Sequence, residues 1–307
     1  MAGNGHRSGK ATMLGDVDIL VHTPPGSGPE AMIKTLISVG AEVGEDTTGW
    51  MTESCTGGHG VTAMRRLAAR AGDATIISTC TPSFVQTPLL EGLTISYRDL
   101  TPLACLMLER YLVLVRADDA ISTPAEFLAN LEAKKTVTGG YLRGGINHLA
   151  GLALADATGG TVEFIQVETA QHLLPALLRR ELDWVIATPK EAASALAART
   201  VRAVALLAAE PSTAFPGLPT LNEAGVQLTL SVWRGLMAPP GISSELQLRW
   251  QDLLLKIVRS QRWAEFLGPG VPPTMLFGRD FTALLDEQQA WYIEQFGRAG
   301  LLGRRES

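Results

Sequence analysis

The residues of this sequence that have catalytic side chains are few and poorly paired. Cys55 and His59 lie four positions apart, but the Thr-Gly-Gly between them predicts a turn rather than a paired thiol and imidazole. Glu30 and Glu168 are candidate acid and base, yet nothing pairs them, and each is more typical of a helix cap or a loop carboxylate. The Gly-x-Ser-x-Gly elbow of hydrolases is absent. We therefore expect no catalytic residue.

Metal and cofactor sites are not indicated either. Cys55, Cys80 and Cys105 are widely spaced and form no Cys-x-x-Cys pair, which favours three buried thiols over a disulfide framework or zinc knuckle. Whether two of them pair stays open. No two histidines have metal-ligand spacing on a helix face; they are His6, His22, His59, His148 and His172. We expect no metal and no cofactor.

Two glycine-rich loops have the composition of an anion site. Each of the segments 22–30 and 138–148 follows a predicted strand and opens a predicted helix. Glycine lets the backbone approach a ligand, and a helix N-terminus offers unpaired N–H groups with the positive end of the helix dipole. Neither loop matches a nucleotide-binding motif. The loops predict a carboxylate site, with ordinary tight turns as the alternative.

Alternating strands and helices must position these loops. The strands are predicted at 18–21, 50–53, 74–78, 103–108, 111–115, 135–138, 162–167, 183–187, 201–207 and 228–237. Helices are predicted from Pro29, after the glycines at 57–60, from a capping box at Thr123, from an Asn147 cap, over 170–180, after Thr188-Pro189, from a capping box formed by Ser244 and Gln247, and over 280–298. This alternation predicts a mostly parallel sheet in each of two lobes.

Composition excludes several classes of protein. The chain has 46% apolar and 19% charged residues, as in an ordinary folded soluble protein, and 307 residues exceed one typical core. A net charge of −5 argues against a nucleic-acid partner. No apolar run approaches the roughly 20 residues that span a bilayer. Residues 1–14 are polar and lack the apolar segment of a secretory signal.

Segments spread along the chain resemble the motifs of one family. The loop 21–30 resembles V-P-F-x-P-G-G-x-x-D, and residues 93–103 resemble L-P-Y-D-P-x-K-D-F-x-P-V. Further matches are 111–115 with V-L-V-V, 123–128 with S-x-x-E-L-I, 147–151 with S-H-L-A-G, 215–225 with L-P-D-V-P-T-V-A-E-A-G, and 233–241 with W-F-G-L-x-A-P-x-G-T-P. Matches in order over 17–302 are more specific than any one loop. The chain thus resembles the periplasmic solute-binding proteins of tripartite tricarboxylate transporters, the Bug family.

The resemblance implies a type II periplasmic-binding-protein fold, in which two α/β lobes joined by two crossings close on a ligand cleft. Lobe one would comprise 15–114 and 232–307 and lobe two 115–231, with 1–14 as a leader or tag. It implies a monomer that captures a small organic carboxylate, aliphatic or aromatic, for membrane permease subunits. A module presenting the same clamp to a sensor or regulator is the alternative. An exported family implies that the signal was removed or replaced; a chain native as given would be cytoplasmic.

The implied contacts are mainly backbone amides and ordered waters. The expected ligand-binding residues are Thr23, Pro25, Gly26, Ser27 and Gly28 in the first loop, Thr81 and Ser83 after the third strand, Tyr141, Arg143, Gly144, Gly145, Ile146, Asn147 and His148 in the second loop, Thr188, and Arg234. Arg143 and Arg234 are candidates to pair with a distal carboxylate or ring substituent, with a salt bridge or a solvated arginine as the alternative for each. Tyr141 and Trp233 are candidates to stack on an aromatic acid, with a core position as the alternative for Trp233.

Several positions depart from the family motifs. Thr23 replaces an aromatic residue, and Pro29 removes a hydroxyl donor. The second loop, polar in the family, carries Tyr141, Leu142 and Ile146 here, and residues 167–171 replace V-P-Y-K-G. The substrate of a relative therefore does not transfer to this chain.

Overall fold

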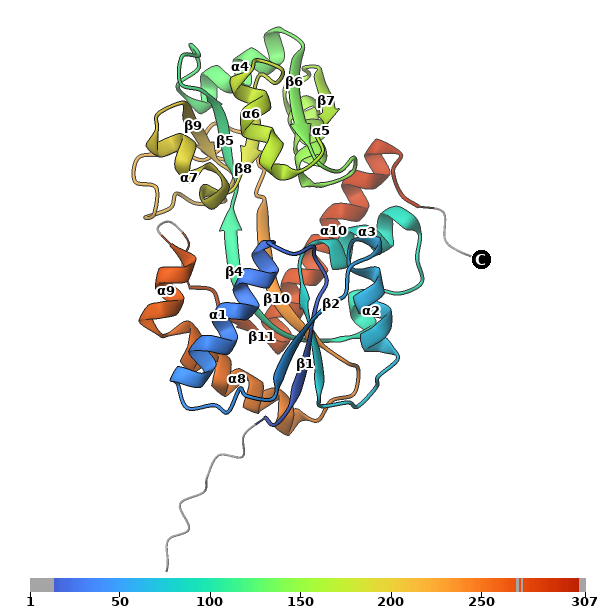
Figure 1. The fold of residues 1–307 in the computed structure, drawn as a ribbon. Coiled ribbons are helices and arrows are strands. Elements are labelled where there is room, and N and C mark those ends of the chain that lie inside the picture. The colour runs from blue at the N-terminus through green and yellow to red at the C-terminus, as the bar shows by residue number, and fades with distance from the viewer. Residues whose placement is uncertain (1–13, 269–270, 272, 304–307) are drawn as a thin grey trace, which may run out of the picture.

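The computed structural model describes residues 14–268, 271 and 273–303 of the chain, so residues 1–13 of the predicted leader lie outside it. Two lobes lie one above the other in Figure 1, joined by extended segments. Among the described residues, no helix combines the length and the apolar character needed to cross a membrane. The two-lobed α/β architecture agrees with the predicted fold class.

The first lobe is built on a six-stranded sheet in the order β11-β4-β10-β3-β1-β2. The strands are β1 (Val17–Val21), β2 (Trp50–Ser54), β3 (Ile76–Cys80), β4 (Thr101–Arg110), β10 (Ser231–Ala238) and β11 (Leu276–Phe277). β1 pairs in parallel with β2 and β3, but β10 is antiparallel to both β3 and β4. The prediction of a mostly parallel sheet is wrong for the β4–β10–β11 half, because β10 returns from the other lobe.

Helices cover both faces of this sheet. One face carries α1 (Gly28–Glu42), α8 (Ser244–Val258) and α9 (Gln261–Leu267), and the other carries α2 (Val61–Ala68), α3 (Ser83–Glu91) and α10 (Gly278–Ala299). Ile19 packs with Met32 of α1, whereas its neighbour Leu20 packs with Phe84 of α3. The alternation along β1 fixes both cores, since successive strand residues point to opposite faces.

The second lobe contains two smaller sheets. β5 (Leu112–Arg116) pairs antiparallel with β8 (Val185–Ala187) and β9 (Val201–Leu206), whereas β6 (Thr136–Gly140) pairs in parallel with β7 (Val162–Gln166). The parallel prediction fails for β5, which enters from the first lobe. The helices are α4 (Pro124–Ala133), α5 (Ile146–Thr158), α6 (Leu173–Leu178) and α7 (Pro189–Ala197). Asp183 joins the two sheets, because its N–H donates to the Val137 carbonyl at 2.8 Å.

Two strands carry the chain between the lobes. β4 ends at Arg110 and β5 begins at Leu112, so only Tyr111 separates the two sheets on this crossing. β5 pairs with β8 and β9 from its first residue, a few positions before the predicted lobe boundary at 115. α10 also bridges the lobes, since Phe296 and Leu149 of α5 share one buried cluster.

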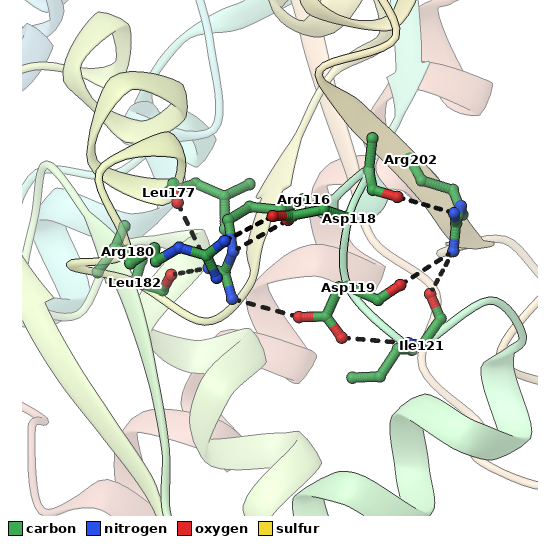
Figure 2. A network of polar contacts seen from close by, with 9 residues as sticks. Arg116, Asp118, Asp119, Ile121, Leu177, Arg180, Leu182 and Arg202 are labelled. Atoms are coloured by element: carbon green, nitrogen blue, oxygen red, sulfur yellow. Dashed lines mark hydrogen bonds and ion pairs between the residues drawn. The ribbon is translucent and has the colours of Figure 1, made fainter.

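Figure 2 shows a polar network that holds the segment after β5. Arg116 donates to the Leu182 carbonyl at 2.9 Å and to the Asp119 carboxylate at 3.2 Å. Arg202 of β9 donates to the Ile121 carbonyl at 3.0 Å. The network ties the turn before α4 to β9 and to the segment that follows α6.

Local signals set most helix starts, with two corrections. The capping box at Thr123 is confirmed. Asn147 is not a cap: Gly145 precedes α5, and the Asn147 amide instead donates to the Ile186 carbonyl at 2.9 Å. α8 is capped by Ser243 rather than Ser244. Gly139 and Gly140, expected in the second loop, belong to β6. The three cysteines are buried, as predicted, and all three are free thiols, which answers the open question of whether two of them pair.

Candidate functional site

A cavity of about 310 Å³ lies between the lobes and is lined from both. Nine expected site residues line it: Thr23, Ser27, Gly28, Thr81, Ser83, Tyr141, Ile146, Asn147 and Arg234. The lining does not include Pro25, Gly26, Arg143, Gly144, Gly145, His148 or Thr188. A hollow near Leu93 is larger, at about 540 Å³, but no expected site residue lines it. The two glycine-rich loops therefore converge on one interlobe cavity.

The first loop presents the start of α1 to the cavity. Ser27 caps the helix by position, but its hydroxyl lies 2.6 Å from the Thr23 hydroxyl and forms no side-chain cap. Glu30 turns back to accept the Gly26 N–H at 2.6 Å, and hydrogen bonds from Lys34 and then Gly26 lower its pKa. The Gly28 N–H has no acceptor among the described residues. This donor is left for a ligand.

Gly28 lets α1 approach a buried ion pair. An added Cβ at Gly28 would lie 2.8 Å from Nε of Arg234. Arg234 Nη1 donates to Oε2 of Glu109 at 2.6 Å, and the Glu109 side chain is fully buried. Oε1 of Glu109 has no hydrogen-bond partner among the described residues. The positive charge of the Arg234 guanidinium at the cavity is thus largely neutralised by the buried Glu109 carboxylate.

The second loop opens α5 without capping it. The Gly144 N–H donates to Nδ1 of His148 at 2.9 Å, so His148 supports the loop instead of lining the cavity. Burial, and then the charge of Arg143, lowers the pKa of His148. Arg143 itself lies 5.9 Å from the centroid of the Phe164 ring. The Ile146 N–H has no acceptor among the described residues, so this helix start also faces the cavity with a free donor.

A buried histidine orients the hydroxyls of a third loop. His22 Nδ1 lies 2.7 Å from the Thr79 hydroxyl, and Nε2 lies 3.1 Å from that of Thr81. Thr81 continues the chain to Ser83 at 3.0 Å, and both line the cavity. Burial lowers the pKa of His22 to about 4, which keeps the imidazole neutral. His22 was not among the expected site residues; its place directly after a strand and before a glycine-rich loop was the available signal.

Three tyrosines from distant parts of the sequence, whose grouping was not predicted, also line the cavity. Tyr141 comes from the second loop, Tyr111 from the crossing and Tyr292 from α10. Tyr111 is 8% exposed, and its hydroxyl has no hydrogen-bond partner among the described residues. Trp233 lies in the first-lobe core with its indole N–H on Gln288 at 2.6 Å. Aromatic surface at the cavity comes from tyrosine, not from Trp233.

Glu191, another residue missed from the sequence, replaces Thr188 at the cavity. The Thr188 N–H donates to Oε2 of Glu191 at 2.8 Å, and the Glu191 N–H donates to the Thr188 hydroxyl at 3.3 Å. This capping box consumes the Thr188 hydroxyl and leaves the Glu191 carboxylate in the lining. Its charge helps raise the pKa of Tyr111, after burial, and that of Tyr141, again after burial. One carboxylate therefore lies close to two of the cavity tyrosines.

Within the described part of the chain, no cluster of three or more histidine, cysteine, aspartate or glutamate side chains is placed to hold a metal ion. Cys55 is buried in the first-lobe core, whereas His59 lines the cavity. The two residues considered as a thiol and its base therefore lie in different environments.

Comparison with protein families decides the assignment. Residues 50–290 match the sequence profile of the tripartite tricarboxylate transporter family receptor, TctC. The chain belongs to this family. A TctC receptor is a solute-binding protein and not a member of an enzyme class, as the resemblance in the sequence implied. No curated protein matches the chain by sequence.

Solved structures show the TctC fold for most of the chain. A TctC solute-binding protein from Polaromonas, solved without ligand, has a TM-score of 0.82 and 20% identity over 92% of this chain and 98% of its own. A Rhodopseudomonas palustris protein with adipate has a TM-score of 0.76 and 18% identity over 94% and 98%. MatC from Rhodopseudomonas palustris with bound malate has a TM-score of 0.69 and 20% identity over 91% and 98%. At these identities the likeness establishes the fold.

Proposed function

We propose that this receptor captures a small organic carboxylate, aliphatic or aromatic, in the interlobe cavity and delivers it to the membrane permease subunits of a tripartite tricarboxylate-type transporter. The observation that supports this most strongly is the meeting of two uncapped helix starts, at Gly28 and Ile146, in one cavity. Each offers N–H donors and the positive end of a helix dipole, which suits an anion. The adipate and malate bound by two structural relatives support the ligand class.

Closure of the two lobes would couple binding to delivery. A ligand that touches Gly28 in one lobe and Ile146 in the other gains both sets of contacts only in the closed form, so binding shifts the population toward it. We propose hinges at Tyr111 and near Ser231, so that the moving bodies are the two predicted lobes with their first boundary at Tyr111 instead of 115, because β5 pairs within the second lobe. The closed form would dock on the permease in the periplasm.

Thermal unfolding with a panel of acids tests the proposal. The panel comprises mono-, di- and tricarboxylates of matched length, aliphatic and aromatic. A ligand at about 100 times its Kd stabilises the bound form by about 2.7 kcal/mol, which is a clear rise in Tm. The acid should be recovered chemically unchanged. A flat response across the whole panel would reject capture of organic acids.

Delivery needs a second measurement. Cells that carry the permease genes should take up a labelled acid from the panel only when this receptor is present. Uptake that is unchanged without the receptor would contradict delivery while leaving binding intact.

A further inference from the structure

The fixed charges around the interlobe cavity favour a single carboxylate on the ligand. Among the described residues that line it, Arg234 is the only one with a permanent positive charge, and Glu109 already holds that charge at 2.6 Å. Glu191 adds a carboxylate to the lining. The sum of these three groups is one negative charge. The cavity therefore offers backbone N–H groups for one anion but no uncompensated cation for a second.

The cations nearest in sequence contact other groups. Arg143 lies over the Phe164 ring, and the Lys190 ammonium lies 4.6 Å from the centroid of the Phe266 ring. Neither residue lines the cavity. A second carboxylate would thus meet Glu191, whose side chain is exposed so that water screens its charge in part, and like charges within one cavity still repel.

Two groups at the cavity can instead accept a hydrogen bond from a ligand. One oxygen of Glu191 accepts the Thr188 N–H, and the other has no partner among the described residues. The Tyr111 residue at the crossing between the lobes is 8% exposed and lines the cavity, and its hydroxyl is also unpartnered in that part of the chain. Neither oxygen is a buried unsatisfied atom, so both are open to the cavity, where a donor group on a ligand replaces water as the partner.

We propose that this cavity selects a monocarboxylate that carries a hydrogen-bond-donating group, a hydroxyl or an ammonium, and discriminates against dicarboxylates. The carboxylate lies on the N–H groups at Gly28 and Ile146, and the donor lies between Glu191 and the Tyr111 hydroxyl. This selectivity rests on the proposed function of the same cavity. It separates the chain from its relatives solved with adipate and malate, which are dicarboxylates.

Calorimetric titration with matched acids tests the selectivity. The pairs are 4-hydroxybutanoate with succinate, 6-hydroxyhexanoate with adipate, and 4-hydroxybenzoate with terephthalate, and 6-aminohexanoate tests an ammonium donor. For the chain length that fits best, the donor acid should bind at least about tenfold more tightly than its dicarboxylate, because the dicarboxylate faces Glu191.

The variant Glu191→Gln then tests the residue that sets the preference. Glutamine keeps the N3 position of the capping box, so the helix start is retained while the charge is lost. The dicarboxylate should gain about tenfold in affinity and 6-aminohexanoate should lose about tenfold. Glu126→Gln is the matched control, since Glu126 holds the same position in the Thr123 box of α4, away from the cavity. It should leave every affinity unchanged, and its Tm should fall at least as far as that of Glu191→Gln, because the Glu126 carboxylate also accepts the Ser122 N–H at 2.8 Å and the Ser122 hydroxyl at 2.7 Å.

The outcomes distinguish failure of the proposed selectivity from failure of the proposed carboxylate capture. If dicarboxylates bind as tightly as the donor acids, or if Glu191→Gln leaves their ratio unchanged, the selectivity is refuted and carboxylate capture stands. If no acid of either kind binds, both fall together. A donor preference that Glu191→Gln removes and Glu126→Gln preserves supports the assignment of Glu191.

Discussion

Replacing Glu109 by glutamine tests the buried ion pair behind the cavity. The Glu109 side chain is fully buried and that of its partner Arg234 is 15% exposed, so water screens the pair very little. Glu109→Gln keeps an acceptor for Arg234 but leaves a buried cation without a counter-charge, and places a buried N–H₂ where Oε1 has no partner. Removing one member of such a pair costs about 3–5 kcal/mol, and we expect the lower end because one hydrogen bond remains.

Urea denaturation of the ligand-free protein measures this cost. The control is Glu245→Gln, the same chemical change in the Glu245–Arg249 pair of α8, whose side chains are 76% and 36% exposed. An exposed pair is worth less than about 1 kcal/mol. Adipate should also bind Glu109→Gln more tightly than wild type, since Arg234 then carries a free charge. Equal denaturation midpoints for the two variants would refute the reasoning.

The remaining predictions concern His22 and Gly28. The pKa of folded His22 is about 4, below the unfolded value of 6.5, so the unfolded chain binds the proton more readily. The stability that this group contributes is therefore complete above pH 6.5 and falls by about 3 kcal/mol as the pH drops to 4. In urea titrations over that range His22→Gln should lose less stability than wild type, and parallel curves would contradict this. Gly28→Ala should weaken acid binding at least about tenfold in calorimetry, because its methyl group displaces Arg234, whereas Gly297→Ala in α10 should not; equal affinities would place the ligand away from α1.

Most helices and strands of the fold were predictable from local sequence. Thr123 and Pro124 set the start of α4 through a capping box, and the alternation of Ile19 and Leu20 marks β1 as a buried strand. The strand directions were not readable, because β10 meets β3 and β4 only after the chain has passed through the second lobe. Pairings between residues so far apart leave no local pattern.

The residues of the candidate site also fall into those that local sequence predicts and those that depend on distant contacts. Gly28 and Ile146 were predictable, since glycine-rich segments before helices produce free N–H donors. Thr188 and His148 were expected at the cavity, but each is held by a group three or four residues away in its own helix start. Side chains near a helix start often bond locally in this way, which removes them from the site.

The residues that were missed come from distant elements. Tyr111 lies on the crossing, Glu191 at the start of α7 and Tyr292 on α10, and only tertiary packing brings them to one cavity. His22 was considered only as a metal ligand, whereas its contacts with Thr79 and Thr81 depend on the pairing of β1 with β3. Composition and residue spacing do not predict contacts between residues that are far apart in the sequence.

Amide NMR gives the most direct test of carboxylate capture by the two helix starts. The perdeuterated, ¹⁵N-labelled protein would be titrated with 6-hydroxyhexanoate and with adipate while the backbone N–H signals are followed. We expect saturable shifts that are largest at Gly28, Ile146 and Asn147, whose N–H groups lack acceptors within the described chain. Saturable binding that leaves these three signals unmoved would contradict carboxylate capture by the two helix starts.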